Sequence, residues 1–226
     1  MSRAYRDRAQ AGEELAGLLN AYAGRADWLV LALPRGGVAV AAPIARTLGL
    51  PLDILPVRRL GVPGQEELAM GAIAAGDDGA VRVLNHDVVT NLGIDAGTVE
   101  AVTGAEQRHL EALALRLRGS RPAPVRRGRG VILVDDGLAT GATMEAAIVS
   151  CRQAGVTKIV VAVPVGAPAT VTQLAGVADT VVCPLRPSRF GAVGFAYHDF
   201  APVQDYEAVD LLNRAWADER ERRTPR

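Results

Sequence analysis

The residues of this chain with the clearest chemical potential lie at 131–144 and read VILVDDGLATGATM. Four apolar residues predict a buried strand, and the helical pattern after the turn predicts a strand, a loop and a helix. Such a loop presents unpaired backbone N–H groups and the positive end of the helix dipole to an anion. Gly137 and Gly141 allow the backbone to approach that anion closely, and the hydroxyls of Thr140 and Thr143 can donate to its oxygens. The segment is therefore predicted to bind a phosphate.

Two carboxylates, Asp135 and Asp136, come directly before this loop. Carboxylates beside a phosphate repel it unless they face hydroxyl groups or a bound cation. We therefore expect a phosphorylated sugar with free hydroxyls, bound together with Mg²⁺. The alternative is a helix N-terminus with two acids near the helix dipole and no ligand.

Two common nucleotide sites do not fit this loop. A nucleotide P-loop uses a lysine to reach the terminal phosphates, and the one lysine of the chain, Lys158, lies well outside the loop. The three spaced glycines of a dinucleotide fingerprint are also missing there. The loop is predicted to serve a different phosphorylated ligand.

A second loop repeats the arrangement. Residues 28–33 predict another buried strand, which is followed by PRGG at 34–37 and by a helical pattern over 38–48. An anion is again favoured at a helix start, and the guanidinium fork of Arg35 suits diphosphate oxygens. Alone, the PRGG segment is also ordinary turn chemistry. Together the two loops predict two phosphate pockets at the carboxyl ends of two parallel strands.

A third element begins after a strand pattern at 52–58. A polar segment with glycine and proline follows, and apolar residues resume at Leu68. Loops of this kind act as lids over a reacting centre, and the cations Arg58 and Arg59 would stabilise charge on a leaving group. We predict a lid over 58–70. A solvated hairpin with surface arginines is the alternative.

The pattern of an apolar strand, two acids, three variable positions and Thr-Gly-x-Thr resembles the ribose-phosphate signature of type I phosphoribosyltransferases. The version at 135–144 is especially similar to that of adenine phosphoribosyltransferases. The resemblance implies that Asp135 and Asp136 hold the ribose 2′ and 3′ hydroxyls. It also implies a diphosphate-binding loop after the first strand, often of unusual peptide geometry, and a mobile hairpin that closes over the diphosphate. The residues that these roles would fall on are Ala139, Thr140, Gly141, Ala142 and Thr143 for the 5′-phosphate, Arg35, Gly36 and Gly37 for the diphosphate, and Arg58 and Arg59 for the hairpin.

Further segments at 5–12, 34–38, 59–61 and 194–200 are similar to a bacterial group of predicted phosphoribosyltransferases that are described by fold. No particular acceptor comes with this resemblance. Hypoxanthine and guanine enzymes place an aspartate at the third variable position of the signature, whereas this chain has Ala139, as adenine enzymes do. An acceptor that needs that aspartate is disfavoured, and Glu66 or Glu67 becomes the substitute acid or base.

All three phenylalanines, Phe190, Phe195 and Phe200, lie in one short stretch together with Tyr197. The family places a variable hood over the sheet to hold the nitrogenous acceptor, and residues 184–206 are the candidate here. Aromatic faces suit a flat ligand. A satellite apolar cluster that pins the C-terminal segment explains the same residues equally well.

The activity implied is transfer of a 5-phosphoribosyl group from phosphoribosyl diphosphate to a nitrogen nucleophile, with Mg²⁺ and with release of diphosphate. Asp135, Asp136, Arg58 and Arg59 are the predicted catalytic residues, and they would act by positioning and electrostatic stabilisation. A non-enzymatic sensor of the same sugar ligand is the rival prediction. A hydrolase that uses water on the same donor is a third.

Alternating strands and helices predict an α/β fold with a mainly parallel, twisted sheet covered by helices on both faces, a lid hairpin and a small C-terminal hood. At 226 residues and 23.7 kDa, the chain is predicted to form one domain over 1–226. Further strands and helices are expected over the following ranges: helices at 7–23, 96–117 and 168–174, and strands at 81–84, 158–165 and 180–183.

The formal net charge is zero, which argues against nucleic acid as the main partner. The arginine-rich run at 121–129 is interpreted as a solvated linker, and 218–226 as a frayed charged tail. No apolar run approaches the roughly 18 residues of a membrane span, and the first residues carry no secretion signal pattern. We therefore expect a cytoplasmic protein, with Cys151 and Cys183 as buried free thiols. No motif encodes the oligomeric state, and a homodimer is compatible with the residues.

Overall fold

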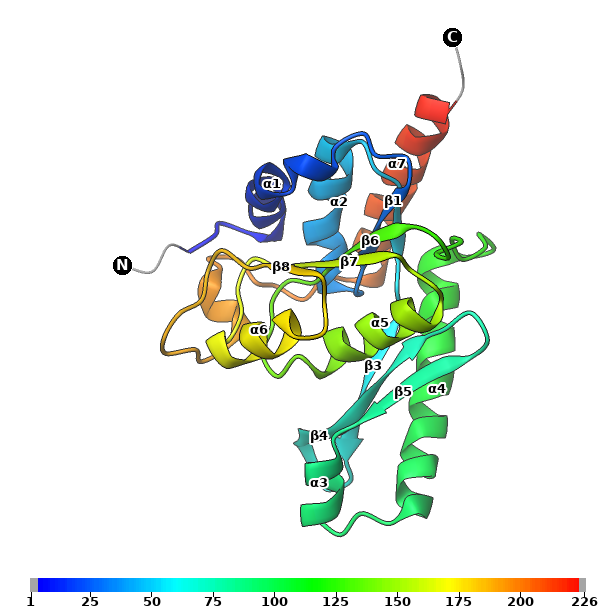
Figure 1. The fold of residues 1–226 in the computed structure, drawn as a ribbon, viewed down its shortest axis with the longest axis vertical. Helices are drawn as coiled ribbons and strands as arrows, with labels where there is room; N and C mark the ends of the chain where they lie inside the picture. Colours follow the sequence, from blue (N-terminus) through cyan, green and yellow to red (C-terminus); the bar gives the residue numbers. More distant parts are fainter. Residues whose placement is uncertain (1–3, 224–226) are drawn as a thin grey trace.

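The computed structural model describes residues 4–223 and is organised around a five-stranded parallel sheet. The strand order is β2-β1-β6-β7-β8 (Figure 1). The strands are β1 (Trp28–Ala32), β2 (Leu52–Ile54), β6 (Gly130–Val134), β7 (Lys158–Ala162) and β8 (Thr180–Val182). In the parallel register Ala32 is paired with Val134, so β1 and β6 end at the same level. The loops that follow these two strands are therefore neighbours.

Helices cover both faces of this sheet, as predicted. One face packs against α1 (Arg8–Leu18), α2 (Gly36–Leu48) and α7 (Asp205–Arg223). The other face packs against α5 (Ala142–Gln153) and α6 (Pro168–Ala175). Successive residues of β1, β6 and β7 enter the two cores alternately, because neighbouring side chains of a strand point to opposite faces. Two short 3₁₀ helices complete this part of the chain, η1 (Asn20–Tyr22) and η2 (Val193–Ala196).

A second, antiparallel sheet extends away from the first (Figure 1). It contains β3 (Val57–Val62), β4 (Gln65–Ala75) and β5 (Ala80–Leu84), with α3 (His86–Asn91) and α4 (Ala96–Arg118) packed against it. Residues 58–70, which are predicted to act as a lid, lie in the hairpin formed by β3 and β4. The prediction of one strand over 52–58 is wrong. Pro56 has no N–H to continue a ladder, so β2 ends at Ile54 and the chain enters the second sheet at Val57.

The prediction of a frayed charged tail over 218–226 is wrong for residues 218–223, which belong to a helix. α7 continues to Arg223, and residues 224–226 lie outside the described part of the chain. The indole N–H of Trp216 donates to the carbonyl oxygen of Leu52 over 2.9 Å, and Glu219 forms an ion pair with Arg121 at 3.1 Å. These contacts hold the helix against β2 and the end of α4, which the charged composition alone did not indicate.

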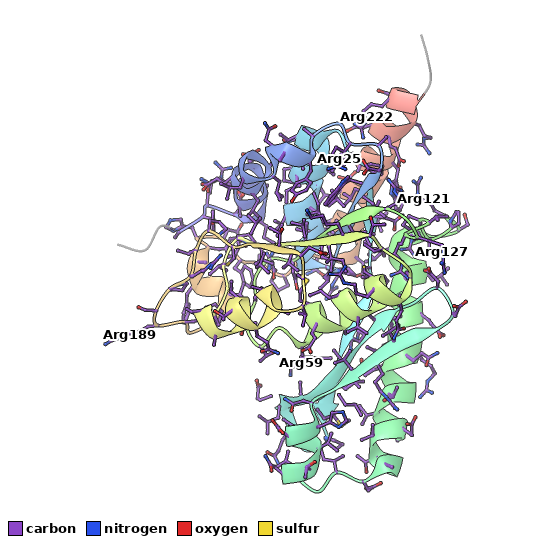
Figure 2. All side chains as sticks on the ribbon, in the orientation of Figure 1. Arg25, Arg59, Arg121, Arg127, Arg189 and Arg222 are labelled. Carbon is purple, nitrogen blue, oxygen red and sulfur yellow. The ribbon has the colours of Figure 1, made fainter. Side chains whose placement is uncertain are left out.

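The run at 121–129 is only partly the solvated linker that we expected. Arg121 and Arg127 lie on the loop between α4 and β6 (Figure 2). Arg126 is buried; its guanidinium donates to the Ser150 hydroxyl over 2.9 Å and to the carboxylate of Asp77. A buried guanidinium needs such partners to offset its desolvation. Arg126 therefore ties the β4–β5 turn to α5.

Other element boundaries differ by a few residues. The helix predicted at 7–23 ends at Leu18, and the strand predicted at 158–165 ends at Ala162, shortly before Pro164. Cys151 and Cys183 are buried and free, and burial raises the pKa of each thiol to about 11. Among residues 4–223, no helix combines the length and the apolar character that crossing a membrane requires.

Candidate functional site

The predicted phosphate loop leaves β6 at Val134 and enters α5 at Ala142. Gly141 adopts φ +79°, and a Cβ there would lie 2.6 Å from the side chain of Thr170. Only glycine fits that conformation and that space. The Thr170 hydroxyl donates to the carbonyl oxygen of Ala139 over 2.6 Å, and the N–H of Leu138 donates to that of Val165 over 2.9 Å. The loop is thus fixed from beneath, while Ala139 and Thr140 are exposed at the start of α5.

The two acids are packed beside this loop in a desolvated position. The backbone N–H of Asp136 donates to Oδ1 of Asp135 over 2.9 Å, and Nε of Arg8 donates to Oδ2 of Asp136 over 2.8 Å. Burial raises the pKa of both carboxyls, and repulsion from Asp136 raises that of Asp135 further, whereas Arg8 opposes the rise at Asp136. A ligand that supplies hydroxyl donors or a cation would stabilise the ionised pair.

The glycines of the second loop lie directly against the acids. The Pro34–Arg35 peptide bond is cis, and α2 begins at Gly36. A Cβ on Gly36 would lie 2.1 Å from Oδ2 of Asp136, and a Cβ on Gly37 would lie 2.6 Å from the carbonyl oxygen of Val134. No larger residue fits at either position without displacing the acids or β6. The structure therefore brings the two predicted anion loops into contact.

Arg35 faces a cavity of about 360 Å³ that opens beside this loop. It is lined by Pro34, Arg35, Val57, Arg58, His109, Leu113 and Arg116. Arg35 and Arg116 form ion pairs with Asp205 at 3.2 and 3.0 Å, and Arg58 forms one with Glu106 at 2.7 Å. Neither Asp205 nor Glu106 belongs to the lining of the cavity. Three guanidinium groups therefore surround a space that suits a polyanion, and we call this space the basic cavity.

Sequence reasoning missed Arg116 and His109. They are seven residues apart on α4 and so share one face of that helix. That spacing was available in the sequence, but nothing local shows that this face turns toward Arg35.

Only one of the two hairpin arginines joins Arg35. Arg58 and Arg59 are consecutive on β3, and consecutive side chains of a strand point to opposite faces. Arg58 lines the basic cavity, whereas Arg59 lies on the side of β3 toward α5 (Figure 2).

One of the two residues considered as a substitute acid or base, Glu67, lies in a different cavity. Glu67 lines a space of about 580 Å³ between the antiparallel sheet and the start of α5, together with Thr140 and Glu145. Neither Asp135 nor Asp136 lines that space. The side chain of Glu66 lies outside the described part of the structure.

The C-terminal segment packs over the acid pair, but its aromatic rings do not form an open platform. The Tyr197 hydroxyl donates to the carbonyl oxygen of Asp136 over 2.6 Å, and its ring stacks on Phe200 with centroids 5.0 Å apart. Both rings belong to a cluster with Tyr5, which favours the interpretation of an apolar cluster that pins this segment. Phe195 differs, because 80% of it is exposed.

The donor set is compatible with Mg²⁺ that is held jointly with a ligand. No cluster of three or more His, Cys, Asp or Glu side chains suited to a metal occurs within residues 4–223. Asp135 and Asp136 nevertheless supply carboxylate oxygens beside a loop suited to phosphate, and Mg²⁺ is commonly bound through one or two carboxylates plus substrate phosphates. The pair therefore fits the predicted mode of binding through the ligand.

Comparisons with known proteins agree with this geometry. The family model described as the phosphoribosyl transferase domain matches residues 3–198. A relative recorded in two strains of Mycobacterium tuberculosis, provisionally named as a phosphoribosyl transferase, is 48% identical over 212 residues, which are 94% of this chain and 47% of that protein. The chain thus spans about half the length of these curated relatives.

Solved structures give the same result for the fold. The crystal structure of TT1426 from Thermus thermophilus is 41% identical and superposes with a TM-score of 0.78, covering 93% of this chain and 98% of that one. The AQ2163 protein from Aquifex aeolicus is 12% identical with a TM-score of 0.50 and covers 91% of this chain and 84% of its own, which supports the fold alone.

Proposed function

The chain belongs to the family of the phosphoribosyl transferase domain, and from this premise we propose that it transfers a 5-phosphoribosyl group from phosphoribosyl diphosphate to a nitrogenous acceptor. The observation that carries the proposal is the contact between the two anion loops. Gly36 is packed against Asp136, so a phosphate at the start of α5 and a diphosphate at the start of α2 would flank one pair of carboxylates. A phosphorylated sugar with a diphosphate on its other end has this arrangement of groups.

The sugar end of the donor is assigned to the loop after β6. Backbone N–H groups at 139–143 and the hydroxyls of Thr140 and Thr143 would bind the 5′-phosphate at the start of α5. Asp135 and Asp136 would accept hydrogen bonds from the ribose hydroxyls. The exposed surface of the loop and its anchored underside support this assignment, because the ligand would meet a preformed cradle.

The diphosphate end is assigned to the loop 35–37 and to the basic cavity. Arg35 and Arg58 line that cavity, and we add Arg116 of α4 to the residues that would neutralise the leaving group. Mg²⁺, when bound through the donor and the acid pair, would neutralise further charge on the phosphate oxygens. We assign no direct contact with the diphosphate to Arg59.

The reaction needs little covalent chemistry from the protein. The bond from the anomeric carbon to a diphosphate oxygen breaks, a bond from the acceptor nitrogen to that carbon forms, and the proton on the nitrogen is released. Positive charge develops on the sugar as negative charge develops on the diphosphate, so fixed carboxylates on one side and guanidinium groups on the other stabilise the transition state. The protein would supply positioning and this charge separation.

Calorimetric titration with phosphoribosyl diphosphate and Mg²⁺ tests the binding part of the proposal. We expect heat of binding for the wild-type chain and a large loss of affinity for Asp136→Ala. Absence of binding, or wild-type binding by Asp136→Ala, contradicts the proposal. A matched surface control is Asp210→Ala, because Asp210 is exposed on α7 and its carboxylate pairs with Arg214 one turn further along the same helix.

Release of diphosphate across a panel of purines, pyrimidines and other amines tests the catalytic part. Turnover with any acceptor supports transfer and excludes a pure sensor. Binding without turnover across the panel supports the sensor, and breakdown of the donor without acceptor supports the hydrolase. We further propose a cytoplasmic location, which the two free, buried thiols support.

A further inference from the structure

Arg8, at the start of α1, makes the only side-chain contact to the carboxylate of Asp136 that the described structure records. Its Nε donates to Oδ2 of Asp136 over 2.8 Å, and the two side chains are 10% and 18% exposed. These residues are 128 positions apart in the chain, so the pairing is a product of the fold. The other oxygen of the carboxylate receives no hydrogen bond from a second side chain among the described residues.

The same guanidinium also holds the C-terminal segment. Its Nη1 donates to the carbonyl oxygen of Ala201 over 2.8 Å. The guanidinium carbon Cζ lies 3.8 Å from the centroid of the Phe200 ring. The planar guanidinium can donate in two directions and stack on an aromatic face at the same time, which an ammonium group cannot do. Arg8 therefore links the carboxylate of Asp136 to residues 200–201 of the C-terminal segment.

The diphosphate loop closes this arrangement from a third side. A Cβ on Gly36 would lie 2.1 Å from Oδ2 of Asp136 and 3.4 Å from Nε of Arg8. The carboxylate oxygen that Arg8 engages is thus confined between the guanidinium and the Gly36 backbone. Its second oxygen is the one left for a ligand.

We propose that Arg8 is a positioning residue that fixes Asp136 for recognition of ribose hydroxyls and couples this orientation to the C-terminal segment. The inference rests on the proposed function, because it assigns Asp136 to the sugar. It goes further, since neither the signature nor the diphosphate loop contains Arg8. A purely structural role would lower stability without changing which sugar phosphate the protein prefers.

The test compares affinities for ribose 5-phosphate and for its 2-deoxy and 3-deoxy analogues, measured by calorimetry with Mg²⁺ on the full chain. The variants are Arg8→Gln and Arg8→Lys, with Asp136→Asn as the reference for loss of the acid. Arg6→Gln is the matched control, because Arg6 is exposed and forms an ion pair with Asp7 instead. Circular dichroism and thermal unfolding establish that each variant is folded.

We expect the wild type and Arg6→Gln to prefer ribose 5-phosphate over at least one analogue by about tenfold or more, the effect of a hydrogen bond to a charged group. Arg8→Gln should lose most of that preference, as Asp136→Asn does, and Arg8→Lys should recover part of it. A folded Arg8→Gln that keeps the wild-type preference overturns the inference.

Three further outcomes are also decisive. If Arg8→Gln does not fold, Arg8→Lys and Phe200→Leu take its place, and a wild-type preference in both of them contradicts the coupling. If the wild type binds no sugar phosphate, the proposed function fails and the inference fails with it. If the wild type binds but the preference is independent of residue 8, the proposed function stands and only the inference falls.

Discussion

The two ends of the candidate site are built in different ways. The sugar end consists of consecutive residues of one strand, one loop and one helix start, and close backbone contacts at Gly36 and Gly141 hold it. The diphosphate end is assembled from the segments around Arg35, Arg58 and Arg116, which come from three distant parts of the chain and leave an open cavity. The first is closely packed and local in the sequence, whereas the second depends on how the antiparallel sheet and α4 sit against the parallel sheet.

The largest effect is expected from a substitution that overfills the contact between the two loops. In Gly36→Ala the new methyl group would lie 2.1 Å from Oδ2 of Asp136, so the loop or the acid must move. A displacement of this kind should lower affinity for phosphoribosyl diphosphate about a hundredfold, and overpacking should lower the free energy of unfolding by about 1–3 kcal/mol. Calorimetry and urea unfolding measure the two effects.

Gly17→Ala is the matched control for this substitution. Gly17 lies in α1, and a Cβ there meets nothing within 4 Å. Alanine should therefore leave binding unchanged and stabilise the helix by about 0.5–1 kcal/mol. Wild-type binding by Gly36→Ala would show that the two loops are not held together as the structure describes.

The next effect concerns the contact between the β4–β5 turn of the antiparallel sheet and α5, which packs on the parallel sheet. Arg126→Ala removes a buried guanidinium that links the Asp77 turn to Ser150 of α5. We expect a loss of about 2 kcal/mol in the free energy of unfolding, below the range for a fully buried pair because Asp77 is half-exposed. Chemical unfolding measures it, with Arg127→Ala at the exposed neighbouring position as the control. Equal stability of the two variants would contradict a role for Arg126 as an anchor.

A smaller effect is expected at the diphosphate end. Arg116→Ala removes one of three guanidinium groups around the basic cavity and should weaken binding of inorganic diphosphate about tenfold, while affinity for ribose 5-phosphate stays unchanged. Arg108→Ala, on the same helix but outside the lining, should leave both affinities unchanged. Equal losses for both ligands would show that the two ends of the site are not separable.

This difference between the ends also explains what the sequence could predict. The loop at 135–143 and the loop at 34–37 were predicted because each consists of consecutive residues with its own backbone chemistry. The parallel sheet followed from alternating apolar strands and helical patterns. Asp135 and Asp136 were predicted as a pair, but their partner Arg8 was not, because nothing near Arg8 in the chain indicates a contact 128 residues away.

The elements that were missed share this cause. In the sequence, Arg116 looks like a solvent-exposed helix residue, and only the packing of α4 shows that it lies beside Arg35. The charged residues in the last turns of α7 led us to predict a tail instead of a helix. The burial of Trp216, which anchors α7, becomes evident only when β2 is in place. Arg58 and Arg59 were grouped because they are adjacent, yet a strand turns adjacent side chains to opposite faces.

The last prediction concerns how readily the region around the parallel sheet opens. Both cysteines, Cys151 in α5 and Cys183 after β8, belong to the core on the α5 and α6 face of the parallel sheet, so alkylation of thiols measures opening of this core. Burial raises the pKa of each thiol from 9.0 to about 11, which lowers the reactive thiolate about a hundredfold near pH 8. We expect native protein to be alkylated at least about a hundredfold more slowly than urea-unfolded protein, as followed by mass spectrometry.

The raised pKa of the two thiols also predicts how the free energy of unfolding changes with pH. Between pH 9 and about 11 the folded chain retains thiol protons that the unfolded chain has released, so the free energy of unfolding should fall as pH rises through this window. Cys151→Ala should reduce that slope. If native and unfolded chains were alkylated at similar rates, the core beneath the sugar loop would open readily, and rigidity would no longer separate the two ends of the site.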